Sequence, residues 1–240
     1  MSVLLEVCVD NSEGLAAAIA GGADRIELCS ALDLGGLTPT PGLIGQASGS
    51  PVPVYAMIRP RAGNFIVTEA DIDAMLREID AVRTAGLSGV VFGASLANGA
   101  LDPVTLERLI RQCDGLGMTL HRAFDLVPDL AEAVDIAVAL GLERILTSGR
   151  ALTSPQGIDD LERIVELAAG RITIMPGSGV TIGNAAGLME RVPFAEIHSS
   201  CAVVTSALNE PARRLGFETA ARKQTSVELV RQLKAFCLSR

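Results

Sequence analysis

The chain has 240 residues, a formal net charge of −8 and 49 % hydrophobic residues. Its acidity argues against nucleic acid or an anionic membrane as partner, since both require a basic surface. No apolar run approaches the roughly 20 residues of a membrane helix, and the N-terminus lacks the basic segment of a signal peptide. We therefore expect a cytoplasmic protein.

Eight short apolar runs are typical of β-strands, and helical patterns lie between them. The strands are expected at residues 3–9, 25–29, 52–58, 89–92, 118–123, 144–147, 172–175 and 196–199. The helices are expected at residues 12–20, 39–48, 68–86, 102–115, from 129 onwards, 157–169, 181–189 and 226–238. Thr68 with Asp71 resembles a capping box, and Asp102 before Pro103 is a typical helix start.

This alternation of strands and helices favours a parallel sheet covered by helices. With eight such units and no linker, it predicts an α/β fold, a single (β/α)₈ TIM barrel that forms one domain over residues 1–240. Residues 202–224 have a weak apolar period. We expect them to form an irregular segment before the last helix, which either covers one mouth of the barrel or is partly mobile.

Charged residues and both histidines of the chain gather where the predicted strands end, which is where ligands bind in such barrels. These residues are Glu6, Glu27, Arg59, Arg61, His121 and His198. Strand alternation places them in the lumen together with Cys8 and Cys29, while Val7, Leu28, Ile58, Leu120 and Ile197 face the helices.

Buried carboxylates need partners, and Arg59, Arg61 and His121 are the expected partners of Glu6 and Glu27. One interpretation is a purely structural ion-pair cluster that plugs the barrel. The other is a catalytic site in which Glu6, Glu27, His121 and His198 act as acid and base, or hold Mg²⁺, Mn²⁺ or Zn²⁺.

Gly177, Ser178 and Gly179 follow the seventh strand, and a short helix is expected to begin near Thr181. Backbone N–H groups at this position of a barrel commonly bind phosphate. We expect an anion site here, with Arg59 and Arg61 as anion clamps. The alternative is a tight turn that requires glycine only for its backbone angles.

The five cysteines have no Cys-x-x-Cys spacing, which indicates reduced thiols without disulfides. Cys8 and Cys29 occupy equivalent places on neighbouring strands. Such a pair can bind Cu(I), with Cys201 or a histidine completing the site. The alternative is that these buried cysteines serve only as small apolar side chains.

Several motifs together resemble the CutC copper homeostasis family. They are Glu-Val-Cys-Val-Asp at 6–10, Gly-Ala-Asp-Arg-Ile-Glu-Leu-Cys-Ser at 22–30, Gly-Gly-Leu-Thr-Pro at 35–39, Met-Ile-Arg-Pro-Arg at 57–61, His-Arg-Ala-Phe-Asp at 121–125, Leu-Thr-Ser-Gly at 146–149, Pro-Gly-Ser-Gly-Val at 176–180 and Glu-Ile-His-Ser-Ser at 196–200. The resemblance covers residues 4–201.

The resemblance implies a (β/α)₈ barrel, a cytoplasmic location, and a role in copper homeostasis through Cu(I) binding. It maps the cysteine ligands onto Cys8 and Cys29, and it implies a homo-oligomer, either a dimer or a tetramer. The residues themselves leave a second hypothesis open, that of a barrel enzyme acting on a small phosphorylated or carboxylated substrate.

Overall fold

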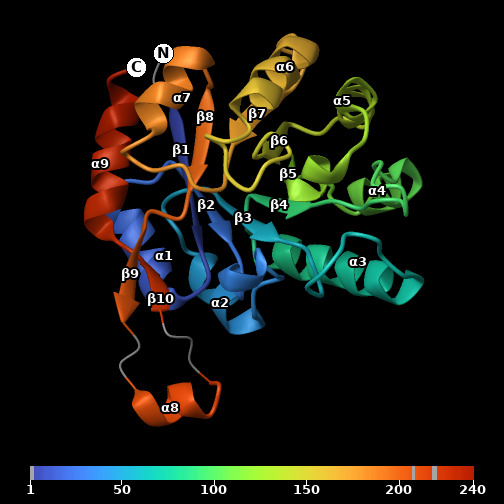
Figure 1. Ribbon diagram of the computed structural model, residues 1–240. Coiled ribbons are helices and arrows are strands. Elements are labelled where there is room, and N and C mark those ends of the chain that lie inside the picture. The colour runs from blue at the N-terminus through green and yellow to red at the C-terminus, as the bar shows by residue number, and fades with distance from the viewer. Residues whose placement is uncertain (1–2, 207–208, 218–220) are drawn as a thin grey trace.

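The computed structural model describes residues 3–206, 209–217 and 221–240. Eight parallel strands surround a common axis, and helices cover their outer side (Figure 1). The strands are β1 (Leu4–Val9), β2 (Arg25–Leu28), β3 (Val54–Met57), β4 (Gly89–Phe92), β5 (Gly117–Leu120), β6 (Arg144–Thr147), β7 (Thr173–Pro176) and β8 (Glu196–Ser199). This arrangement confirms the predicted (β/α)₈ barrel.

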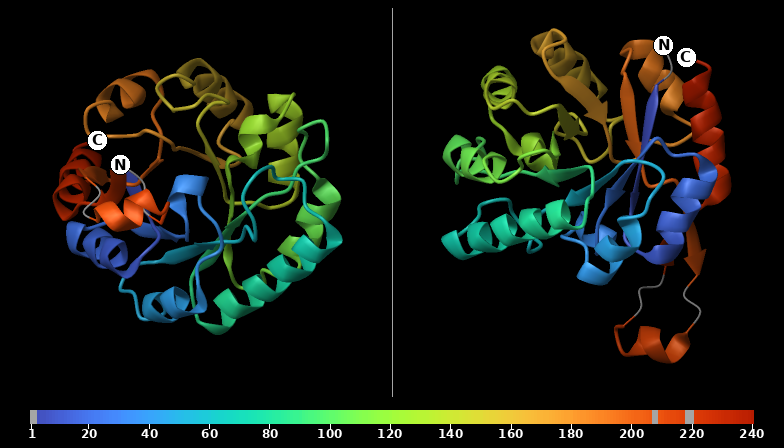
Figure 2. Two further views of the ribbon diagram at one scale, coloured as in Figure 1. Left: turned by 60° about the horizontal axis from the view of Figure 1, so that its bottom comes forward. Right: turned by 180° about the vertical axis from the view of Figure 1, so that it is seen from behind.

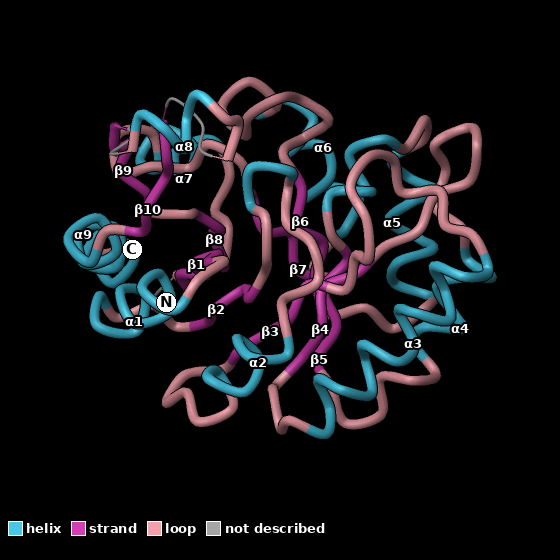
Figure 3. Tube along the Cα trace, turned by 90° about the horizontal axis from the view of Figure 1, so that it is seen from below, coloured by secondary structure: helices cyan, strands magenta, loops and turns pink. Residues whose placement is uncertain are grey.

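The barrel is nearly closed rather than fully hydrogen-bonded. The strand order runs β7-β6-β5-β4-β3-β2-β1-β8, and the described residues show no ladder between β7 and β8. A side chain bridges this seam instead, because the Arg25 guanidinium contacts both Met175 of β7 and Glu196 of β8. Seen from below, the strands lie together in the interior and the helices lie around them (Figure 3).

The outer layer consists mainly of α-helices, with two short 3₁₀ turns following β2 and β5. In chain order these elements are α1 (Ser12–Gly21), η1 (Leu32–Leu34), α2 (Pro41–Ala47), α3 (Glu69–Thr84), α4 (Pro103–Ile110), η2 (Arg122–Leu126), α5 (Leu130–Ala139), α6 (Ile158–Ala168) and α7 (Ala185–Arg191). The capping box of Thr68 and Asp71 is present at the start of α3, and Asp102 caps α4 ahead of Pro103.

The helix expected from Thr181 begins later, at Ala185. The Asn184 side chain accepts a hydrogen bond from the Thr181 N–H and donates one to the Gly179 carbonyl. These two bonds hold residues 179–184 as a turn, so the helix starts only after it.

Side-chain alternation follows the prediction. The main hydrophobic core lies between strands and helices and includes Val7, Leu28, Ile58, Leu120 and Ile197. A smaller apolar cluster, formed by Cys29, Tyr55, Met57 and Val91, lies apart from it. Side chains two residues apart on a strand point to the same face. The side chains of Arg25 and Glu27 therefore face the lumen, as that of Cys29 does.

The tract after β8 is more regular than expected. β9 (Ala202–Ser206) and β10 (Ala221–Thr225) form an antiparallel pair, and α8 (Glu210–Arg214) lies between them in the chain. These elements form an arm that projects beyond the rim where the barrel strands end (Figure 2). The base of the arm approaches the barrel mouth, because Ala202, Lys223 and Thr225 line a surface cavity together with Cys8.

α9 (Val227–Leu238) returns beside α1, and the two ends of the chain lie together (Figure 1). A hydrogen bond from the Val3 N–H to the Cys237 carbonyl joins them, with an N···O distance of 3.1 Å. Among the described residues, no helix combines the length and apolar character that crossing a membrane requires.

Candidate functional site

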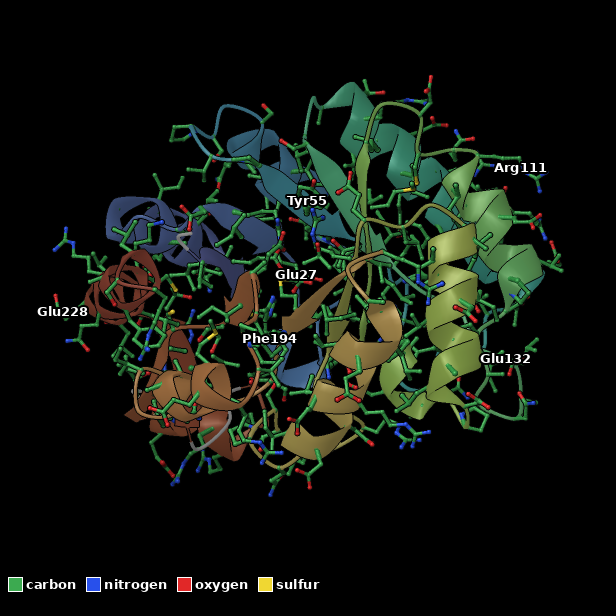
Figure 4. All side chains as sticks on the ribbon, turned by 90° about the horizontal axis from the view of Figure 1, so that it is seen from above. Glu27, Tyr55, Arg111, Glu132, Phe194 and Glu228 are labelled. Atoms are coloured by element: carbon green, nitrogen blue, oxygen red, sulfur yellow. The ribbon has the colours of Figure 1, made fainter. Side chains whose placement is uncertain are left out.

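A network of charged side chains fills the inside of the barrel below the mouth. Arg25 forms ion pairs with Glu6 and Glu196, and Arg144 also reaches Glu196. The Tyr55 ring lies against both guanidinium groups. Its centroid is 5.2 Å from the guanidinium carbon of Arg25 and 5.0 Å from that of Arg144. Figure 4 shows Glu27 and Tyr55 within the ring of strands, whereas Arg111, Glu132 and Glu228 lie at the periphery.

Glu6 has different partners from those expected. Its carboxylate binds Arg25 and the Nδ1 atom of His198, which is 2.8 Å from Oε1; neither Arg59, Arg61 nor His121 contacts it among the described residues. Burial raises the pKa of Glu6, but the His198 hydrogen bond and the Arg25 charge outweigh it and lower the pKa to about 2. Glu6 is therefore a carboxylate at neutral pH.

The Glu6 carboxylate orients the imidazole ring of His198. With Nδ1 directed at Glu6, Nε2 lies 3.9 Å from Oε2 of Glu27. Burial lowers the pKa of His198, yet Cys8 and Glu27 raise it well above its ordinary value. Glu6 is thus a supporting residue that fixes the ring, as carboxylates often do behind histidines that bind metals.

Cys8, Glu27 and His198 form the cluster of donor atoms at the mouth. One donor atom from each lies within 4.8 Å of the others, and all three side chains are buried. The Oε1 atom of Glu27 has no hydrogen-bond partner among the described residues. Burial is the main cause that raises the pKa of Glu27, and the nearby Glu6 charge adds to it.

Cys29 stands outside this cluster, which corrects the expected equivalence of the two cysteines. The register of β1 and β2 places Cys8 opposite Glu27, so Cys29 lies two residues further along. Its Sγ is 3.5 Å from Oε2 of Glu27, and burial together with that carboxylate raises its pKa well above the ordinary thiol value. Cys201 is also buried and outside the cluster, and burial raises its pKa to about 11.

A cavity of about 150 Å³ opens beside the cluster. Cys8, Glu27 and His198 border it from β1, β2 and β8, and Arg59 and His121 border it from the ends of β3 and β5. Sequence reasoning missed several residues of its lining, namely Leu32, Gly35, Met57, Phe65, Arg122 and Leu146. Met57 shares a strand face with Arg59, an expected lumen residue, and was detectable, whereas Phe65 comes from a loop with no periodicity.

Arg59 reaches the cavity, but Arg61 does not line it. The Arg61 guanidinium forms an ion pair with Asp71 of α3, with a distance of 3.1 Å between Nε and Oδ2. Only some of the backbone N–H groups of the Gly177–Gly179 loop are free to bind an anion, since the Gly177 N–H already donates to the Thr147 carbonyl. Ser178 borders the cavity, while Gly179 lines a neighbouring cavity that also includes Cys201.

The fold and the cluster define a (β/α)₈ barrel with a thiol, a carboxyl group and an imidazole at the carboxyl ends of neighbouring strands. A sequence model described as the CutC family matches residues 3–203. The chain belongs to the CutC family.

Named relatives agree with this assignment. A family protein CutC of Rhizobium meliloti is 57 % identical over 233 residues, covering 97 % of this chain and 95 % of that protein. One of Caulobacter vibrioides is 61 % identical over 198 residues, covering 82 % and 81 %.

Solved structures also resemble the chain. The CutC protein of Streptococcus agalactiae, whose description proposes a role in copper homeostasis, superposes with a TM-score of 0.79 at 32 % identity, over 82 % of this chain and 98 % of that one. A phosphoribosylanthranilate isomerase of Pyrococcus furiosus shares the fold alone, with a TM-score of 0.59 at 12 % identity over 99 % and 100 %.

Proposed function

We propose that this protein binds Cu(I) at the Cys8–Glu27–His198 cluster and serves copper homeostasis in the cytoplasm. The observation that carries the proposal is the convergence of three donor atoms within 4.8 Å at the barrel mouth. Family membership adds support, because the Streptococcus agalactiae relative is described with that role.

Two of the three donors, the Cys8 thiol and the His198 imidazole, fit a soft ion. Thiolate and imidazole are ligands that Cu(I) accepts in two- or three-coordinate sites. Glu6 keeps the His198 ring in place through Nδ1, which leaves the other ring nitrogen on the side of Glu27. The unpartnered Oε1 of Glu27 would gain a partner from a cation held beside it.

The test is a Cu(I) titration against a competing colorimetric chelator, with Cys8→Ser compared with Cys29→Ser. We expect one Cu(I) per chain, an affinity at least tenfold weaker in Cys8→Ser, and near wild-type affinity in Cys29→Ser. The second variant is the matched control, since both thiols are buried in the lumen. Stoichiometric binding that survives Cys8→Ser would overturn the proposal.

A second function is supported by a different part of the cavity, where Arg59 is buried and has no carboxylate partner among the described residues. Under this proposal the chain is a barrel enzyme acting on a small anionic substrate. Glu27 is the candidate acid or base, because burial raises its pKa and its side chain borders the cavity. Turnover that disappears in Glu27→Gln would support this function.

We also propose that the chain acts as one domain and assembles as a dimer or tetramer. A single eight-stranded sheet supports the first statement. The exposed apolar side chains of Val204 and Phe217 on the arm support the second. Sedimentation of the full chain measures the assembly directly.

A further inference from the structure

We infer that the cavity at the barrel mouth binds a small monocarboxylic acid, whose carboxylate lies against Arg59 and His121. This inference narrows the second function proposed above to one class of anion, and it rests on that proposal only in requiring that an anion occupies the cavity. Binding of a carboxylate requires neither bound copper nor catalytic turnover, so its test is independent of both.

Arg59 is a buried cation that has no counter-ion in the described part of the chain. The residue is only 8 % exposed, and Nη1 and Nη2 donate to the carbonyl groups of Leu34, Gly36 and Gly63. Its Nε atom has no partner among the described residues, and no ion pair of Arg59 occurs there. A buried ion costs several kcal/mol unless an opposite charge compensates it.

The other deeply buried arginines of the barrel are compensated differently. Arg25 is paired with Glu6 and Glu196, and Arg144 is paired with Glu143 and Glu196. Arg59 has three neutral carbonyl groups as acceptors in place of a carboxylate and keeps an unpartnered Nε, which points to an anion supplied by a ligand.

The Phe65 ring lies 4.9 Å from the Arg59 guanidinium carbon. Such a cation–π contact contributes about 0.5–2 kcal/mol, which is less than the cost of burying the charge. The same ring also lies 4.7 Å from the His121 ring. Phe65 therefore holds the two polar side chains beside each other without neutralising Arg59.

His121 offers a hydrogen bond without adding a charge. Burial and the neighbouring Arg59 lower its pKa to about 3, so the ring is neutral at physiological pH. Its Nδ1 accepts a hydrogen bond from the Ala123 N–H at 3.2 Å. The ring proton is therefore on Nε2, and no acceptor is found for it among the described residues.

The charge of this part of the cavity suits a carboxylate better than a phosphate. Arg59 supplies one positive charge, and the neighbouring Arg122 is already bound to Asp125 and Ser148. A phosphate dianion would keep a charge uncompensated in a buried site, whereas a monocarboxylate would not.

The size of the cavity limits the rest of the ligand. Its volume of about 150 Å³ is close to that of an engineered protein cavity that admits benzene. Leu32, Met57 and Leu146 line it with apolar surface. A short hydrocarbon or a single ring attached to the carboxylate would fill this space.

The experiment uses the metal-free full chain in the presence of a chelator, with butyrate, butyramide and inorganic phosphate as probes observed by ligand NMR. Butyrate and butyramide have nearly the same shape and differ in charge. We expect butyrate to bind at least tenfold more tightly than either of the other probes. Equal binding of butyrate and butyramide, a preference for phosphate, or no binding of butyrate would overturn the inference.

Variants locate the site. Arg59→Gln should abolish the preference for butyrate, and Arg61→Gln should keep it, because Arg61 lies in the same loop but pairs with Asp71. Arg59 also braces two loops, so Arg59→Lys serves as a second variant that retains the charge and should retain a reduced preference. An equal effect of Arg59→Gln and Arg61→Gln, or loss of the preference in Arg59→Lys with the fold intact, would refute the assignment to Arg59.

Discussion

Substitution of Glu6 by glutamine tests the charged network beneath the site. Glu6 is fully buried between Arg25 and His198, and its pKa falls from an ordinary value of 4.5 to about 2. A shift of this size corresponds to about 3 kcal/mol of stability at pH 7, since each pKa unit is worth about 1.4 kcal/mol. The Glu6→Gln variant should lose that amount.

The stabilisation by Glu6 should decrease as the pH falls. Because the folded state binds the Glu6 proton more weakly than the unfolded chain, its contribution is fully present above pH 4.5 and is lost as the pH falls toward 2. At pH 4 the difference between wild type and variant should therefore be smaller than at pH 7 by roughly 1 kcal/mol.

Urea unfolding followed by circular dichroism at pH 7 and pH 4 measures both quantities. Asp73→Asn is the control, because its pair with Arg77 is exposed to solvent and such pairs contribute little. A Glu6→Gln loss no larger than that of the control, or a loss that is the same at both pH values, would refute the reasoning.

Two further substitutions test local packing. In Gly93→Ala the new Cβ would lie 2.5 Å from the His121 ring, so we expect a loss of about 1–3 kcal/mol and weaker butyrate binding. Gly45→Ala has open space around it and should show neither effect in thermal unfolding and NMR. Thr68→Ala removes the hydroxyl that accepts the Asp71 N–H and should cost about 1 kcal/mol in urea unfolding; an unchanged stability would contradict the capping role.

Residues of the site differ in how far the sequence predicts them. Cys8, Glu27 and His198 were expected at the mouth from the ends of their strands, and the structure brings them together there, while Glu6 lies beneath them and holds the His198 ring. Arg59 and Arg61 are two residues apart, so strand alternation predicts that both face the lumen. Only Arg59 lines the cavity, because the chain leaves the strand direction after β3. Arg25 was overlooked as the partner of Glu6, although it shares a strand face with Glu27.

The sequence by itself determined the barrel, the side-chain faces of its strands and the rim at which polar residues gather, because these depend on short-range periodicity. Only the tertiary structure decided that Cys8 lies opposite Glu27 instead of beside Cys29. It also placed the Phe65 loop against Arg59 and His121, and it paired β9 with β10. Strand register and loop position result from contacts between segments far apart in the chain, so no local pattern specifies them.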